Sequence, residues 1–132
     1  MKQLWDSETV ERIAERIKAQ RLRDEAGLAR RVEQAHVEAR RIALQFAEEC
    51  SPPVRRVFLF GSLAEDRVRS LSFDIDLAAE GGDLLRCILI AEKSEFHVDV
   101  VALESLPEAM RAGVESHGVV LYEAAADGAV GR

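Results

Sequence analysis

The sequence predicts an α/β (α+β) domain, a small mixed sheet with helices on one face, preceded by a long N-terminal helical arm. Residues 7–49 contain no proline and are rich in Ala, Glu and Arg, which favour helix. After residue 53, apolar runs suited to strands alternate with helix-like segments. The 132 residues, 48% of them hydrophobic, suffice for one core but not for two ordinary domains.

We expect residues 1–50 to form the arm, in two helical segments joined near Asp24 to Gly27. One very long helix is the alternative, because Gly27 is the only glycine in the stretch. The second segment carries apolar residues at alternating spacings of four and three, typical of a coiled-coil seam or of a helix packed on its own domain. They are Leu28, Val32, Ala35, Ala39, Ile42 and Phe46. Prolines 52 and 53 then end the helix.

The compact core is expected at residues 51–123. Its predicted strands are 54–60, 73–79, 96–103 and 119–122. Its predicted helices are a short turn at 62–66 and longer segments at 83–93 and 107–116. Residues 124–132, rich in Ala and Gly, are expected to be a flexible tail.

Composition narrows the class of protein. A net charge of -6 and a pI near 5.1 argue against a broad surface for a nucleic-acid duplex. Cys50 and Cys87 do not have the spacing of a metal site, and we interpret both as reduced and structural. No signal-peptide pattern and no run of the ~20 apolar residues that cross a membrane is visible. We therefore predict a cytoplasmic protein without a membrane partner.

Three aspartates carry the chemistry that the sequence predicts. Side chains alternate along a strand, so Asp74 and Asp76 share one face, and Asp99 lies in a later strand. Such a pair alone usually marks a solvated face. Three carboxylates facing one cleft would instead repel each other, and divalent cations would relieve that repulsion. By the same alternation His97 shares the face of Asp99, either as a polar residue bordering the cleft or as a ligand or proton shuttle.

A Gly61-Ser62 turn closes the apolar run 57–60. Glycine permits close approach of the backbone, and amides at a helix start point toward an anion. The turn therefore suits a phosphate, although an ordinary strand-to-helix turn is the alternative.

Together these motifs resemble the nucleotidyltransferase superfamily related to DNA polymerase β, most closely its minimal stand-alone members, the MntA-type antitoxins. The segments that carry the resemblance are 58–64, 72–77, 98–101 and 115–123, within residues 54–123. The resemblance implies the nucleotidyltransferase fold and transfer of a nucleoside monophosphate, expected to be AMP from ATP, to a hydroxyl of a partner protein. It implies as partner an all-helical HEPN-type toxin, of which this chain would be the antitoxin.

The resemblance also assigns roles to residues. Asp74 and Asp76 would bind two Mg²⁺ ions, and Asp99 would complete the metal site and help to activate the acceptor hydroxyl. Gly61 and Ser62 would hold the β- and γ-phosphates of ATP. Independently of the resemblance, two hard cations need carboxylate oxygens and stabilise both the attacking and the leaving oxygen.

Departures from the superfamily pattern leave an alternative open. Glu65 and Asp66 stand where relatives often carry a basic side chain and a glycine, so Arg67 or Arg69 would have to reach the phosphates. If neither does, the chain is a weak or inactive protein of the same fold that binds and masks a helical partner. An aminoglycoside-modifying enzyme fits less well, because little chain remains for an antibiotic pocket. Self-association through the arm is a further expectation.

Overall fold

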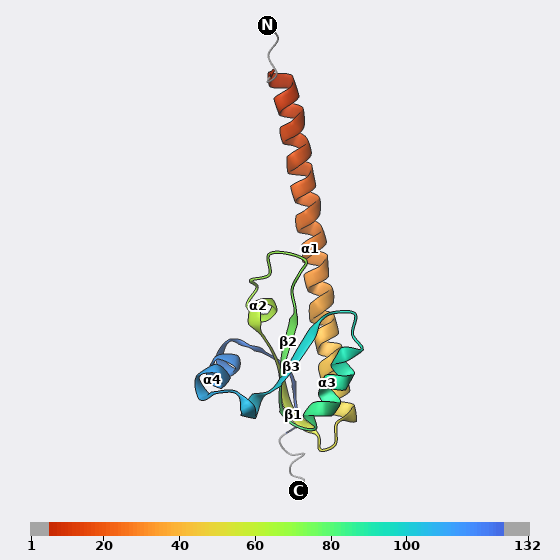
Figure 1. Cartoon of the computed structure of the whole chain (residues 1–132), viewed down its shortest axis with the longest axis vertical. Coiled ribbons are helices and arrows are strands. Elements are labelled where there is room, and N and C mark those ends of the chain that lie inside the picture. Colours follow the sequence, from red (N-terminus) through yellow and green to blue (C-terminus); the bar gives the residue numbers. More distant parts are fainter. Residues whose placement is uncertain (1–5, 126–132) are drawn as a thin grey trace.

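The structure is a computed structural model and describes residues 6–125 (Figure 1). Its elements are α1 (Ser7–Glu49), β1 (Val54–Phe60), α2 (Gly61–Ala64), β2 (Ile75–Gly81), α3 (Leu84–Glu92), β3 (Val98–Ala102), the 3-10 turn η1 (Leu103–Ser105), α4 (Glu108–His117) and β4 (Val119–Glu123). The predicted α+β class, with a small sheet behind a long N-terminal helix, is confirmed. The predicted tail lies largely outside the described residues.

The four strands form one mixed sheet in the order β3-β2-β1-β4. β1 is antiparallel to both β2 and β4, whereas β2 and β3 are parallel and are joined through α3. The first residues of β2 and β3 therefore lie beside the last residues of β1, at one end of the strands. The candidate site lies at this end of the sheet.

Helices cover both faces of the sheet. Val57 and Leu59 of β1 pack with α1 and α3, whereas Phe58 between them packs with Val114 of α4 on the opposite face. The prediction that the helices cover one face of the sheet is thus correct for α1 and α3 but wrong for α4 (Figure 1). The reason is that the central strands β1 and β2 are apolar on both sides, so each face needs a cover.

A single helix, α1, spans 43 residues, so the prediction of two segments is wrong. Asp6 caps its start by accepting a hydrogen bond from the Thr9 amide at 2.7 Å. Gly27 interrupts neither the hydrogen bonds nor the axis, because a glycine costs a helix only about 1 kcal/mol and its neighbours are strong helix formers.

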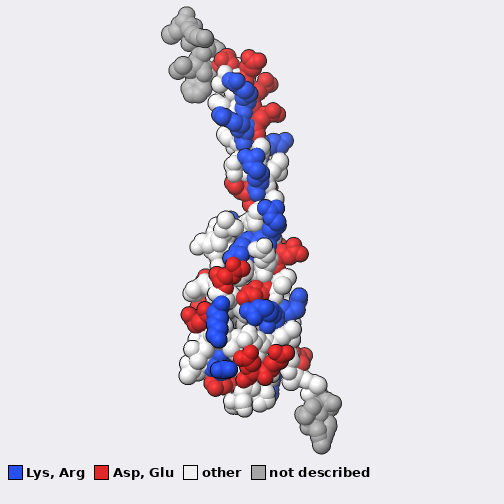
Figure 2. Space-filling model, turned by 90° about the vertical axis from the view of Figure 1, so that its right-hand side faces the viewer, with Lys and Arg blue, Asp and Glu red and all other residues white. Residues whose placement is uncertain are grey.

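The two halves of α1 have different surroundings. In the second half the predicted seam packs on the chain's own domain, and Ala35, Ile42 and Phe46 are fully buried. The first half projects beyond the domain, leaving Val10, Ile13 and Ile17 exposed by 45%, 43% and 55% (Figure 1). Figure 2 shows Lys and Arg side chains along one face of this projecting half. No helix among residues 6–125 is both long and apolar enough to span a membrane.

Two buried thiols join the end of α1 to α3. Cys50 Sγ and Cys87 Sγ lie 3.2 Å apart, and both cysteines are free. Burial, with the neighbouring thiol, raises the pKa of Cys87, so its sulfur stays protonated and packs as a small apolar group.

Replacing Phe46 tests how far the domain depends on the second half of α1. Phe46→Ala should lower the free energy of unfolding by about 3–5 kcal/mol, because it empties a fully buried site. Leu44→Ala, two residues away and 48% exposed, should cost less than about 1 kcal/mol. Urea unfolding, monitored by circular dichroism, gives the free energy of unfolding of both variants. Equal losses of this free energy would contradict this role of α1.

Candidate active site

The parallel pairing of β2 with β3 brings two of the predicted aspartates together. Asp76 and Asp99 are each the second residue of their strand and are direct partners in the ladder. Side chains of direct partners project from the same face of a sheet. Asp74 lies just before β2, which begins at Ile75 and not at Phe73 as predicted.

Electrostatics ties the three carboxylates into one group. Burial raises the pKa of Asp76, and the charges of Asp99 and then Asp74 raise it further. The side chains of Asp74 and Asp99 remain exposed by 50% and 54%, so solvent and ligands reach them. The group is thus open on one side and electrostatically unfavourable without a cation.

Gly61 lies directly against the Asp76 carboxylate. Its φ of +79° belongs to the left-handed region, and a Cβ at this position would collide with Asp76 Oδ2. Any other residue would therefore push the carboxylate away. Ser62 follows in α2, and its carbonyl accepts a hydrogen bond from the Arg67 amide at 2.8 Å.

His97 is nearer to the carboxylates than the sequence suggested. Its Nδ1 lies 3.0 Å from Asp74 Oδ1 and 4.0 Å from Asp99 Oδ2. Strand alternation predicts that His97 shares the face of Asp99, but it does not predict the contact with Asp74. That contact depends on how β2 and β3 align, which no local pattern reveals.

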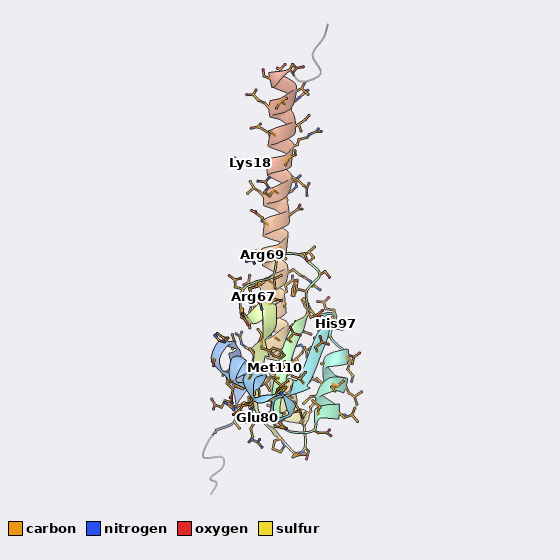
Figure 3. All side chains as sticks on the ribbon, turned by 60° about the vertical axis from the view of Figure 1, so that its left-hand side comes forward. Lys18, Arg67, Arg69, Glu80, His97 and Met110 are labelled. Atoms are coloured by element: carbon orange, nitrogen blue, oxygen red, sulfur yellow. The ribbon has the colours of Figure 1, made fainter. Side chains whose placement is uncertain are left out.

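The two arginines expected to serve the phosphates are engaged within their own loop. Arg67 Nε lies 3.2 Å from Glu65 Oε1. Arg69 donates to the carbonyls of Asp66 and Val68 at 3.3 Å and 3.0 Å. In Figure 3 both stand at the same end of the domain as His97, far from Glu80 at the other end. They are near the site without contacting its carboxylates.

The donor atoms fit divalent cations. Ligand atoms of Asp74, His97 and Asp99 lie within 4.8 Å of one another, and Asp76 adds a further carboxylate beside Asp99. Carboxylate oxygens are the ligands that Mg²⁺ and Mn²⁺ prefer. The arrangement can hold a cation next to the Gly61 turn.

Removing the Asp76 charge should stabilise the metal-free protein. Since the folded-state pKa of Asp76 is raised, the folded protein binds more protons than the unfolded chain between the two pKa values, and stability falls as pH rises through that window. At pH 7 in chelator, Asp76→Asn should therefore melt a few degrees above the parent protein, measured by calorimetry. Asp24→Asn on α1 is the control and should leave the melting temperature nearly unchanged. A lower melting temperature for Asp76→Asn would contradict the repulsion.

Known proteins match this chain through structure. No protein-family model and no curated protein matches its sequence. A chain of the solved structure described as "Crystal structure of the toxin-antitoxin with AMP-PNP" is similar, with a TM-score of 0.54 and 21% identity over 67% of this chain and 76% of that chain. A chain from a mutant of the toxin-antitoxin MntA-HpeT has a TM-score of 0.49 and 23% identity, over 64% and 72%. At this identity the first match establishes a shared fold, and the chain has the fold of that toxin-antitoxin component.

Proposed function

We propose that the protein is a Mg²⁺-dependent nucleotidyltransferase that transfers AMP from ATP to a hydroxyl of a partner protein. The observation that carries the proposal is the convergence of Asp74, Asp76 and Asp99 beside Gly61, at a turn that tolerates no Cβ. The similar solved chain belongs to a toxin-antitoxin structure with AMP-PNP, a relative of ATP, which supports the choice of nucleotide.

Each residue has a role in this proposal. Asp74 and Asp76 would hold two Mg²⁺ ions with Asp99, and the ions would supply positive charge for the phosphate oxygens. Gly61 would let the triphosphate approach the backbone, with Ser62 beside it. Asp99 would orient the acceptor hydroxyl and help to remove its proton.

The reaction is a single displacement at the α-phosphorus of ATP. The acceptor oxygen forms a bond to that phosphorus as the bond to the bridging oxygen breaks, and pyrophosphate leaves. The hydroxyl proton passes to a carboxylate oxygen of the site. The half-exposed Asp74 and Asp99 side chains leave room for an acceptor carried on another protein.

The proposed partner is a helical HEPN-type toxin, with this chain as its antitoxin. The projecting half of α1 supports a protein partner, because isolated helices are only marginally stable and this one exposes an apolar stripe. Self-association through the same stripe is also part of the proposal. A cytoplasmic setting suits the free Cys50 and Cys87 thiols.

Label transfer tests the proposed reaction. Incubation with Mg²⁺, ATP labelled at the α-phosphate and a toxin co-purified as its complex should label the toxin. Asp74→Asn combined with Asp76→Asn should reduce labelling by at least about a hundredfold, because the proposed metal site loses two charges. Glu123→Gln, at the end of β4 that lies away from the carboxylates, should label normally. Undiminished labelling by the double variant would refute the assigned chemistry.

A non-catalytic role as a masking protein is the second candidate. The pairing of Arg67 with Glu65 favours it, because the first cation of the loop after Ser62 is already bound to a carboxylate of the same loop. In that case the complex forms, but no label moves in any variant.

Releasing Arg67 distinguishes a weakened enzyme from an inactive one. Glu65→Gln removes the paired charge, and both side chains are substantially exposed, so the effect should be modest. If the protein is an enzyme, KM for ATP should fall roughly two- to fivefold with kcat little changed. Glu95→Gln, whose partner Arg31 lies on α1, is the control. A KM that rises or stays constant would rule out a phosphate role for Arg67.

A further inference from the structure

His97 is fixed beside the carboxylates by the sheet. It immediately precedes β3, and its carbonyl accepts a hydrogen bond from the Ile75 amide at 2.9 Å. This bond continues the ladder in which Asp76 opposes Asp99. The backbone of His97 therefore lies next to Asp74, whose chain neighbour makes the bond.

The imidazole points at the carboxylates although it is free to turn away. Its side chain is 68% exposed, yet Nδ1 lies 3.0 Å from Asp74 Oδ1 and 4.0 Å from Asp99 Oδ2. An octahedral ion with bonds of about 2.1 Å places neighbouring ligand atoms about 3.0 Å apart and opposite ones about 4.2 Å apart. The ligand atoms of Asp74, His97 and Asp99 all lie within 4.8 Å of one another, so that small movements of these exposed side chains would bring them to such separations.

We infer that His97 is a nitrogen ligand of the metal site and gives it a preference for first-row transition ions such as Mn²⁺ over Mg²⁺. The inference rests on the proposed function for the site itself and adds the class of ion. None of the roles assigned above to Asp74, Asp76 and Asp99 requires a nitrogen donor.

Ligand chemistry explains why one imidazole changes the preference. Mg²⁺ is a hard ion that takes oxygen ligands and keeps several waters, so a nitrogen donor adds little to its affinity. Transition ions accept carboxylate oxygen and imidazole nitrogen in one site. His97 should therefore strengthen Mn²⁺ binding selectively.

Electron paramagnetic resonance of Mn²⁺ added to the metal-free full-length protein tests the inference. Loss of the free-ion signal gives the affinity, and spin-echo modulation detects a directly bound ¹⁴N nucleus. The parent protein should show nitrogen coupling, and Mg²⁺ should displace Mn²⁺ only in excess. His97→Ala should lose the coupling and weaken Mn²⁺ binding by at least about tenfold, with Mg²⁺ affinity changed less than about twofold.

His36→Ala on α1 and His117→Ala at the end of α4 are the matched controls and should retain both the coupling and the affinity. Mn²⁺ bound without nitrogen coupling in the parent protein, or equal Mn²⁺ affinity in His97→Ala, would overturn the inference while leaving the proposed transferase intact. Absence of any Mn²⁺ or Mg²⁺ binding would overturn both. Label transfer with Mg²⁺ alone separates the two proposals, since it tests the reaction and not the nitrogen ligand.

Discussion

Repulsion among Asp74, Asp76 and Asp99 is the constraint on which the site depends. Such a group persists only if the backbone holds it in place, and the parallel ladder between β2 and β3 does so by setting Asp76 opposite Asp99. On the β1 side, Gly61 makes room for the Asp76 carboxylate, because a Cβ at this position would collide with Asp76 Oδ2. The repulsion among these charges thus lowers the stability of the folded protein until a ligand neutralises them, a loss that is common at functional sites.

The rest of the chain supplies the rigidity that this arrangement needs. Ile42 and Phe46 of α1 pack beneath the sheet with Leu59 and Leu77. On the other face, Val114 of α4 packs against Phe58 and Ala78. Arg56 of β1 joins the sheet to α4 through ion pairs with Glu80 of β2 and Glu115 of α4, at 2.7 Å and 2.8 Å. Because the central strands are covered on both sides, their ends cannot drift apart without opening a core.

Much of this could be predicted from local pattern, and the exceptions have a common cause. Apolar runs located the strands, and Asp76 and Asp99 lie within two of them as predicted. The contact between His97 and Asp74 escaped prediction because it depends on the alignment of two strands that are separated by α3. The position of α4 and the continuity of α1 through Gly27 likewise depend on packing and on a small helix penalty, which residue types alone do not decide.

The continuity of α1 has a mechanical consequence. A helix of about twenty free residues extends roughly 30 Å, and this one is clamped at its other half by core side chains. The projecting half of α1 therefore acts as a rigid extension of the domain and not as a flexible linker. A molecule bound at the tip is held at a fixed distance and angle from the carboxylates, and a force on the tip reaches Ala35, the first fully buried residue of α1, before it reaches Ile42 and Phe46.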